Sequence, residues 1–150
     1  MIGIWADCFM RSVLMITKSQ QNRGSYMRLY PLANHLSTLG NEITLLCPHE
    51  RPQATIEVRR VNNNFKLILL PRFATRTHFA GMMYRALRSI PFLVETKYDL
   101  IHCCSPAFPD TWLPLFMGKL KHIPILVDLD DLWGFDGDGR RTWRQYMVRS

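Results

Sequence analysis

The sequence predicts an α/β fold in which helices flank a doubly wound, mostly parallel sheet. Short, continuous apolar runs occupy residues 12–17, 42–47, 99–104 and 123–127, which is typical of strands buried on both faces. Helical patterns lie between these runs, and each crossover between parallel strands is expected to be right-handed. An extended pair at 56–70 adds the remaining strands.

The first helix is expected where apolar residues recur at helical spacing after the first strand. One face carries Leu29, Leu32, Ala33, Leu36 and Leu39. Gly40 follows at the position where helices often end on a left-handed residue. Pro31 is tolerated only in the first helical turn, so the regular helix is expected to begin near Arg28 or later.

The rest of the chain completes one domain of 10–150, a length that can bury a substantial core. Three consecutive asparagines, 62–64, predict a turn inside the extended pair, and 111–122 predicts an apolar helix. Residues 140–150 indicate the start of another helix. Residues 1–9 fit nothing that follows, so we expect an extension or loosely held arm, with a short extra edge strand as the alternative.

The composition indicates a globular protein with an anionic partner. Hydrophobic residues make up 47% of the chain and charged residues 21%, which excludes a disordered chain. The net charge of +7 suits nucleic acid, a phosphorylated substrate or a lipid headgroup. Five of the twelve acidic residues lie within 128–138, so the remainder is more basic than the total suggests.

The four cysteines predict buried, reduced thiols in a cytoplasmic protein. Cys8, Cys47, Cys103 and Cys104 show neither a CxxC pair nor a metal-ligand spacing with histidine. No apolar run approaches the ~18 residues that a membrane span needs. Asp7 interrupts the first apolar residues, and no secretory cleavage site follows.

The acidic end of the run at 123–127 is the leading candidate for a site. Asp128, Asp130 and Asp131 follow a buried strand, and open α/β sheets place ligands at the carboxyl ends of their strands. A polar loop that only caps the strand explains them equally well. No window within 128–138 supplies the alternate acids, central glycine and closing glutamate that an EF-hand loop needs together, so we expect no metal.

The loop at 19–28 is a candidate phosphate-binding site. Gly24 allows close backbone approach, Ser25 is placed to cap the following helix, and Arg28 adds a positive charge. The loop matches neither GxGxxG nor GxxxxGKS, which argues against a dinucleotide fingerprint or a P-loop. A plain capped helix start is the alternative.

Two further segments carry candidate residues. His102 lies in a strand whose carboxyl end opens toward the same edge as Asp128, with Ser105 at the tip, although a lone strand histidine is more often structural. Between 72 and 94 the chain has no acid. An apolar stripe there comprises Phe79, Met82, Met83, Ala86, Leu87 and Ile90. Arg85 and Arg88 accompany it, so this helix either faces the core or lies on an anionic membrane surface.

Taken together, these pieces resemble the N-terminal half of a GT-B glycosyltransferase of the family 4 type. The matching text is MRSVLMITKS, RGSYMRLYPLANHLSTLGNEITLLCP, YDLIHCCSP and IPILVDLDDLWG. It covers about 10–141, in the family's order and spacing. The last motif is similar to a subgroup ending DWDDLWG. The resemblance implies a Rossmann-like domain, one half of a GT-B fold, that chiefly binds the acceptor.

The resemblance also implies roles for individual residues. Gly24 and Ser25, with Arg28, match the loop that approaches the donor's diphosphate, where the family often has Gly-Gly. Asp130 is the implied catalytic carboxylate, which would orient or deprotonate an acceptor hydroxyl. The implied acceptor cleft is formed by His102, Ser105, Asp128 and Asp131. Cys104 stands where a second histidine is frequent.

The implied substrates are a nucleotide-sugar donor and a glycan or lipid-linked acceptor, with no metal or other cofactor and no nucleic acid. Peripheral contact with the inner face of the membrane involves Phe79, Met83, Arg85 and Arg88 in this interpretation. Family members carry the nucleotide-sugar site in a second domain, so we expect a fragment that is inactive alone or needs a partner chain. Two alternatives remain: a non-catalytic module whose basic face binds anionic lipid or nucleic acid, and another Rossmann-like enzyme, such as an oxidoreductase, against which the absent GxGxxG argues.

Overall fold

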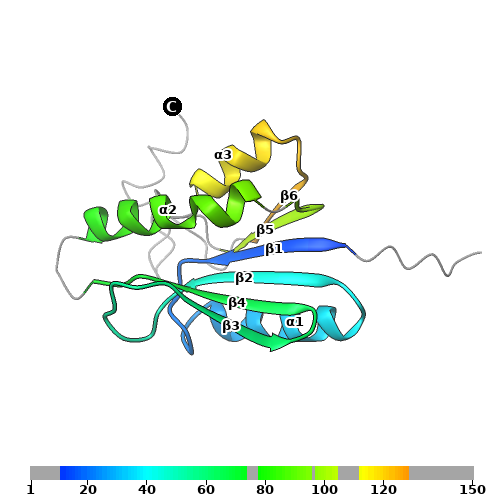
Figure 1. Ribbon diagram of the computed structural model, residues 1–150, viewed down its shortest axis with the longest axis horizontal. Helices are drawn as coiled ribbons and strands as arrows, with labels where there is room; N and C mark the ends of the chain where they lie inside the picture. Colours follow the sequence, from blue (N-terminus) through cyan, green and yellow to red (C-terminus); the bar gives the residue numbers. More distant parts are fainter. Residues whose placement is uncertain (1–10, 74–77, 96, 105–111, 129–150) are drawn as a thin grey trace, which may run out of the picture.

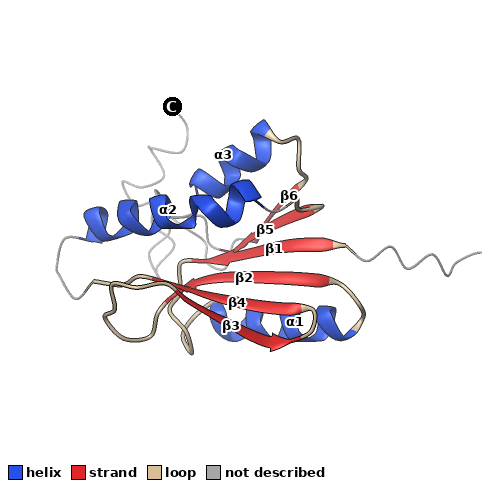
Figure 2. Cartoon of the chain, viewed as in Figure 1, coloured by secondary structure: helices blue, strands red, loops and turns tan. Residues whose placement is uncertain are grey.

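The computed structural model describes residues 11–73, 78–95, 97–104 and 112–128. They form a six-stranded sheet in the order β3-β4-β2-β1-β5-β6, with α1 on one face and α2 and α3 on the other (Figures 1 and 2). All neighbouring strands are parallel except β3 and β4. The elements are β1 (Ser12–Thr17), α1 (Tyr26–Thr38), β2 (Glu42–Pro48), β3 (Glu57–Asn62), β4 (Phe65–Leu70), α2 (His78–Glu95), β5 (Leu100–Cys104), α3 (Trp112–Leu120) and β6 (Ile125–Asp128). The predicted fold class is confirmed.

The central strands are buried on both faces, which explains their continuous apolar sequence. Along β1, Val13 and Met15 pack against the α1 side, whereas Leu14 and Ile16 pack against the side of α2 and α3. Side chains alternate between the faces of a strand, so a strand covered on both sides needs apolar residues at every position. The sheet is therefore the middle layer of three.

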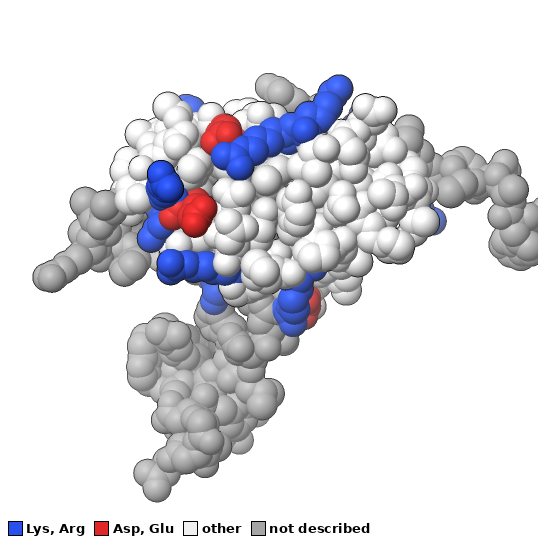
Figure 3. All heavy atoms as spheres, turned by 90° about the horizontal axis from the view of Figure 1, so that it is seen from below, with Lys and Arg blue, Asp and Glu red and all other residues white. Residues whose placement is uncertain are grey.

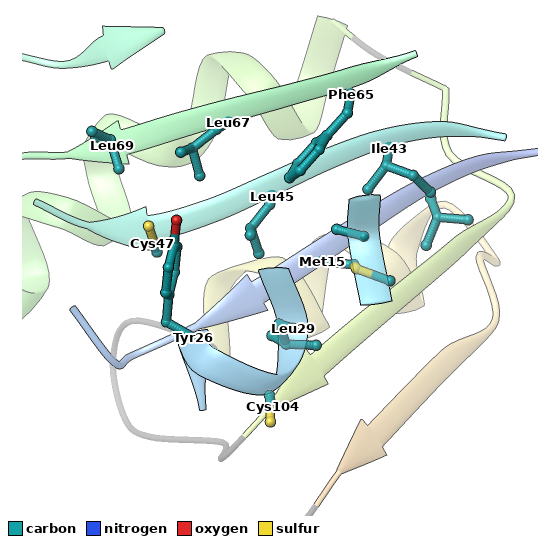
Figure 4. Close-up of a cluster of buried hydrophobic side chains, with 12 residues drawn as sticks. Met15, Tyr26, Leu29, Ile43, Leu45, Cys47, Phe65, Leu67, Leu69 and Cys104 are labelled. Carbon is teal, nitrogen blue, oxygen red and sulfur yellow. The ribbon is translucent and has the colours of Figure 1, made fainter. Parts of the chain in front are cut away.

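The core on the α1 side is continuous from helix to sheet (Figure 4). Tyr26, Leu29 and Ala33 of α1 lie against strand residues that include Leu45 and Cys47. Burial raises the pKa of the Cys47 thiol to about 12 and is the main reason that the pKa of Tyr26 rises to about 12. Both groups therefore stay protonated at neutral pH.

The predicted burial of the cysteines is confirmed for the described residues. Cys47, Cys103 and Cys104 are all buried. Cys8 lies outside the described residues, as does the whole of segment 1–9.

Helix α1 begins at Tyr26, so the predicted start near Arg28 or later is wrong. Pro31 lies inside the helix on its exposed side, where the carbonyl that loses its partner can be solvated. The predicted stripe is also only partly buried, because Leu32 and Leu39 are exposed. Tyr26 and Ser37 take part in the buried face instead.

The end of α1 is closed by a Schellman motif. The Gly40 N–H donates to the Ser37 carbonyl over 3.1 Å, and the Asn41 N–H donates to the Leu36 carbonyl over 3.3 Å. Gly40 has a φ of +92°, as expected for the left-handed residue of this motif. The chain then enters β2 directly, which fixes the register of β2 beside β1.

Strand β6 departs from the prediction of a strand buried on both faces. It is the edge strand of the described sheet, and Leu126 keeps 51% of its surface exposed. A short apolar run has the same pattern at an edge as in the centre, because burial depends on the strand order. The predicted asparagine turn and extended pair are confirmed, and β3 and β4 pair in the antiparallel direction.

Replacing Gly40 should destabilise the protein through the backbone alone. A Cβ at Gly40 would meet no atom within 4 Å, so Gly40→Ala introduces no clash. Because an L-residue at positive φ is strained, we expect the free energy of unfolding to fall by about 1–2 kcal/mol. Urea unfolding measures this change. Gly40→Asn, which tolerates this conformation better, should lose clearly less, and equal losses would contradict the explanation.

Gly118 should tolerate no larger side chain, because it lets α3 pack closely on the sheet. A Cβ at Gly118 would lie 2.7 Å from Ile101 Cδ1 and 3.1 Å from Ile125 Cδ1. We expect Gly118→Val to lower the free energy of unfolding by about 1–3 kcal/mol through overpacking. Gly81→Ala in α2 is the matched control, since its nearest atom is 3.8 Å away. That control should be neutral or stabilising in the same urea experiment.

Candidate functional site

The carboxyl ends of β1, β5 and β6 meet at one edge of the sheet, beside the start of α1. Arg28 of α1 reaches across this edge. Its Nη2 lies 3.4 Å from Cys104 Sγ and 3.3 Å from Asp128 Oδ2. The Cys104 thiol donates to the same Asp128 oxygen over 3.5 Å. Residues separated by as many as 100 positions therefore form one polar cluster, which we call the Arg28 cluster (Arg28, Cys104 and Asp128).

The strand register explains this convergence. Cys104 and Asp128 are direct partners in the parallel pair β5–β6, so their side chains project from the same face. That face is the α1 side, where Cys104 joins the core of α1. Arg28 lies in the first turn of α1 and can therefore reach both residues.

The loop between β1 and α1 is held by its own serines. The Ser25 N–H donates to Ser19 Oγ over 3.1 Å, and the two serine hydroxyls are 3.1 Å apart. Gly24 has a φ of +49°, and a Cβ there would lie 2.7 Å from Ser19 Oγ. Glycine is thus needed at Gly24 for both its conformation and its space.

The prediction that Ser25 caps α1 through its side chain is wrong. Ser25 occupies the N-cap position, but its φ of −60° and ψ of −21° are already helical, and its side chain makes no cap hydrogen bond. The hydroxyl is engaged with Ser19 instead. The serine therefore ties the loop together, and the first N–H groups of the helix depend on other partners.

His102 lies on the α1 side of β5, two residues before Cys104, and is buried. Burial is the main reason that the pKa of His102 is lowered. The Asp128 carboxylate opposes this change and the Arg28 guanidinium reinforces it. The imidazole is therefore neutral at pH 7, so one of its ring nitrogens can accept a hydrogen bond.

Cys104 was not predicted as a site residue beyond its place in the family pattern. Burial is the main cause of its raised pKa, and the nearby Asp128 carboxylate raises it further, although the Arg28 hydrogen bond lowers it. The thiol thus remains protonated and serves as a donor to Asp128. The apolar run around Cys104 carries no signal of this role.

The structure brings some of the predicted site residues together. Arg28 and Asp128 are in contact at one edge, and Gly24 and Ser25 lie in the adjoining loop. His102 is buried on the same face of β5, two residues before Cys104. The predicted residues Ser105, Asp130 and Asp131 lie outside the described residues.

The α2 candidates do not share one exposed face. Phe79 is 56% exposed and Arg88 is exposed, whereas Met83 and Arg85 are half-buried. The predicted apolar stripe is wrong as a single core-facing surface, because Leu87 is exposed. The buried positions of α2 are Ala86, Ser89 and Leu93. The Ser89 hydroxyl donates to the Ala86 carbonyl, so this polar residue can be buried. A pattern of apolar residues therefore does not identify its position as buried.

Two cavities adjoin these elements. One of 360 Å³ lies between the β1–α1 loop and α2, with Lys18, Arg23 and Arg85 in its wall. The other, of 780 Å³, is apolar and lies between α3 and β6, where Trp112 and Phe116 line it. The larger cavity contains none of the predicted site residues, so its size alone does not mark it as the site.

The described residues contain neither a clustered metal site nor a membrane-spanning helix. No group of three or more His, Cys, Asp and Glu side chains there could hold a metal ion. None of the helices in this part of the chain has the length and apolar character to cross a membrane.

The fold has a counterpart among solved structures. The C-terminal domain of a hydrogenase from Pyrococcus furiosus is 19% identical, with a TM-score of 0.57 over 81% of this chain and 92% of that domain. At this identity the likeness shows the fold alone. A search of curated proteins gave no match.

The family assignment comes from the sequence profile. The model of Glycosyltransferase Family 4 matches residues 23–150, which include α1, every strand after β1, and the Arg28 cluster. The match begins within the β1–α1 loop and extends over far more than half of the chain. Together with the doubly wound sheet, it places this chain in glycosyltransferase family 4.

Proposed function

We propose that this chain is the acceptor-side domain of a glycosyltransferase that moves a sugar from a nucleotide-sugar donor to an acceptor hydroxyl. The observation that carries the proposal is the convergence of Arg28, His102 and Asp128 at the carboxyl edge of a sheet with the family's fold. Ligands of open α/β sheets bind at this edge. Carboxylate, imidazole and guanidinium are suited to a hydroxyl acceptor and an anionic leaving group.

The substrate that accepts the sugar would be held at this edge by side chains that accept hydrogen bonds from its hydroxyl groups. The Asp128 carboxylate lies beside Arg28 and can accept one hydrogen bond, and the neutral His102 imidazole can accept a second. Both groups can orient a sugar hydroxyl for attack, since a base must lie within hydrogen-bond reach of the proton it removes. Asp130 remains the proposed catalytic base, with Asp131 and Ser105 in the same cleft.

The donor's diphosphate would approach the β1–α1 loop. Gly24 is exposed there, and the buried Ser25 follows it. Arg28 is 55% exposed in its side chain and its partner Asp128 is 40% exposed, so their ion pair is worth only about 0–1 kcal/mol. A diphosphate could therefore draw Arg28 from Asp128, which would release the carboxylate for the acceptor.

The nucleotide and most of the donor sugar are proposed to bind a second domain, outside residues 1–150. No metal or other cofactor is proposed. The test is isothermal titration of the chain with UDP-, GDP- and ADP-sugars. We expect dissociation constants no tighter than about 1 mM, because the loop offers contacts to the diphosphate only. Micromolar binding would overturn the assignment to the acceptor side.

The environment of His102 predicts that two substitutions shift its pKa in opposite directions. Removing the Asp128 charge in Asp128→Asn should lower the pKa of His102 further, because that carboxylate favours the imidazolium. Removing the Arg28 charge in Arg28→Gln should raise the same pKa. NMR titration of the imidazole protons measures both changes. Lys66→Gln, in β4, is the control and should leave the His102 pKa unchanged; shifts of one sign in both site variants would refute the arrangement.

A further inference from the structure

The side of α2 that faces away from the sheet is apolar and exposed. Its exposed residues include Phe79, Tyr84, Leu87 and Val94. Leu87 keeps 56% of its surface exposed and Val94 keeps 52%. A helix on the surface of a globular domain normally turns polar and charged residues to the solvent. This side of α2 therefore has the composition of a contact surface.

Helix α3 repeats the pattern. Trp112, Phe116 and Leu120 are 61%, 58% and 58% exposed, and their spacing of four residues places them on one side of the helix. Pro114 and Gly118 are the buried residues, on the side toward the sheet. Trp112 and Phe116 also line the apolar cavity of 780 Å³ beside β6. A second helix thus carries a row of large apolar side chains that its own domain does not bury.

The two helices lie on one face of the sheet and contact each other (Figure 1). Leu93 of α2 shares a buried cluster with Leu113 and Met117 of α3. The Lys121 ammonium, just after α3, donates to the Leu93 carbonyl over 2.6 Å and to the Val94 carbonyl over 3.1 Å, which joins the helix ends. Their outward residues therefore share one side of the molecule. We call it the α2–α3 face (Leu87, Arg88, Val94, Phe116, Lys119 and Leu120).

The α2–α3 face combines its apolar surface with positive charge. The sequence has no Asp or Glu within 58–94 or within 111–127, which include nearly all of α2 and the whole of α3. Arg88 and Lys119 are exposed on the face. On the α1 side, by contrast, the Arg28 cluster contains a carboxylate that neutralises its arginine. The α2–α3 face is therefore complementary to a surface that is both apolar and anionic.

We propose that the α2–α3 face docks onto the surface of an anionic lipid bilayer. Helices lying in the membrane interface bury apolar side chains at the boundary of the acyl chains and keep cations among the headgroups. Leu87, Phe116 and Leu120 would enter that boundary. Arg88 and Lys119 would lie at the lipid phosphates, since long basic side chains extend past apolar neighbours to reach charge.

The structure changes which residues take part in this contact. The sequence predicts membrane contact through α2 alone, with Phe79, Met83, Arg85 and Arg88. Met83 and Arg85 are half-buried and do not belong to the α2–α3 face. Leu87, which has the pattern of a core residue, is exposed there instead. The contribution of α3 follows from its position beside α2 and has no basic amphipathic pattern to predict it.

Docking by this face would bring the candidate site to the membrane. Both helices return between parallel strands, so both begin near the carboxyl edge of the sheet, where the Arg28 cluster lies (Figure 1). Phe79 and Trp112, close to these starts, are 56% and 61% exposed. An acceptor anchored in the same bilayer would then be within reach of the edge. This last step rests on the proposed function, whereas the docking itself does not.

The first arm of the test measures co-sedimentation of the chain with vesicles of phosphatidylglycerol and phosphatidylcholine, and with vesicles of phosphatidylcholine alone. We expect binding to the anionic vesicles that weakens about tenfold or more in Leu87→Glu and in Phe116→Glu, because each loses a side chain that the bilayer would bury. Leu32→Glu is the matched control. Leu32 is a leucine of α1, 40% exposed on the opposite face of the sheet, so this variant has the same change of net charge and should bind as the unmodified chain does. Thermal unfolding checks that each variant is folded.

The second arm removes the cations. Arg88→Gln and Lys119→Gln should each weaken binding to the anionic vesicles about fivefold, and binding of the unmodified chain should fall as salt is raised. Binding to pure phosphatidylcholine should be weaker and should not change in these two variants.

Three results would overturn the proposal. The first is the absence of binding to anionic vesicles. The second is an equal loss in Leu32→Glu and Leu87→Glu, which would indicate an effect of net charge alone. The third is self-association of the chain that Leu87→Glu abolishes, seen in sedimentation velocity without vesicle binding, which would assign the face to a second copy. None of these bears on nucleotide-sugar titration, so the failure of this proposal and that of the proposed function are distinguishable.

Discussion

Parallel pairing of β1 with both β2 and β5 is the constraint on which the rest of the structure depends. Because the strands run in one direction, their carboxyl ends meet at one edge, and every loop that follows a central strand opens there. Burial of β1 on both faces requires α1 on one side and α2 on the other. The β1–α1 loop therefore lies at the edge between the two helical layers, although Asn22, Arg23 and Gly24 are exposed.

Basic and acidic side chains are unevenly distributed, so the net charge of +7 does not describe each part of the surface. Figure 3 shows one face on which basic side chains are separated by wide uncharged areas and acidic side chains lie directly beside some of them. Glu57 and Arg59 form an ion pair at the sheet edge, and the Arg59 hydrogen bond is the main reason that the pKa of Glu57 is lowered. Such pairs neutralise each other at short range. The excess positive charge therefore acts where acids are missing, as beside α2 and the loop.

Local sequence signals predicted the elements whose environment is set locally. The bounds of β1, the asparagine turn and the left-handed Gly40 follow from patterns within a few residues. The predictions failed where the answer depends on the rest of the sheet. The exposure of β6 follows from its place at the edge, and the helical start at Tyr26 follows from burial of its side chain in the α1 core. The sequence predicts a capping role for Ser25 because it does not show that the partner of the Ser25 hydroxyl is Ser19, on the other side of the loop.

The candidate site shows the same division. Arg28, His102 and Asp128 could be predicted separately, since each follows or lies in a strand or loop that reaches the carboxyl edge, but their mutual contact depends on the register of β5 and β6. Arg85 shows most clearly what helical periodicity cannot predict. The pattern predicts on which face of the helix a residue lies, but not that Arg85 lies near the β1–α1 loop. An acid-free run is a signal that does not depend on periodicity. Two such runs, in the β1–α1 loop and in α2, lie beside the central strands, so the two faces of the sheet carry different charges around the β1–α1 loop.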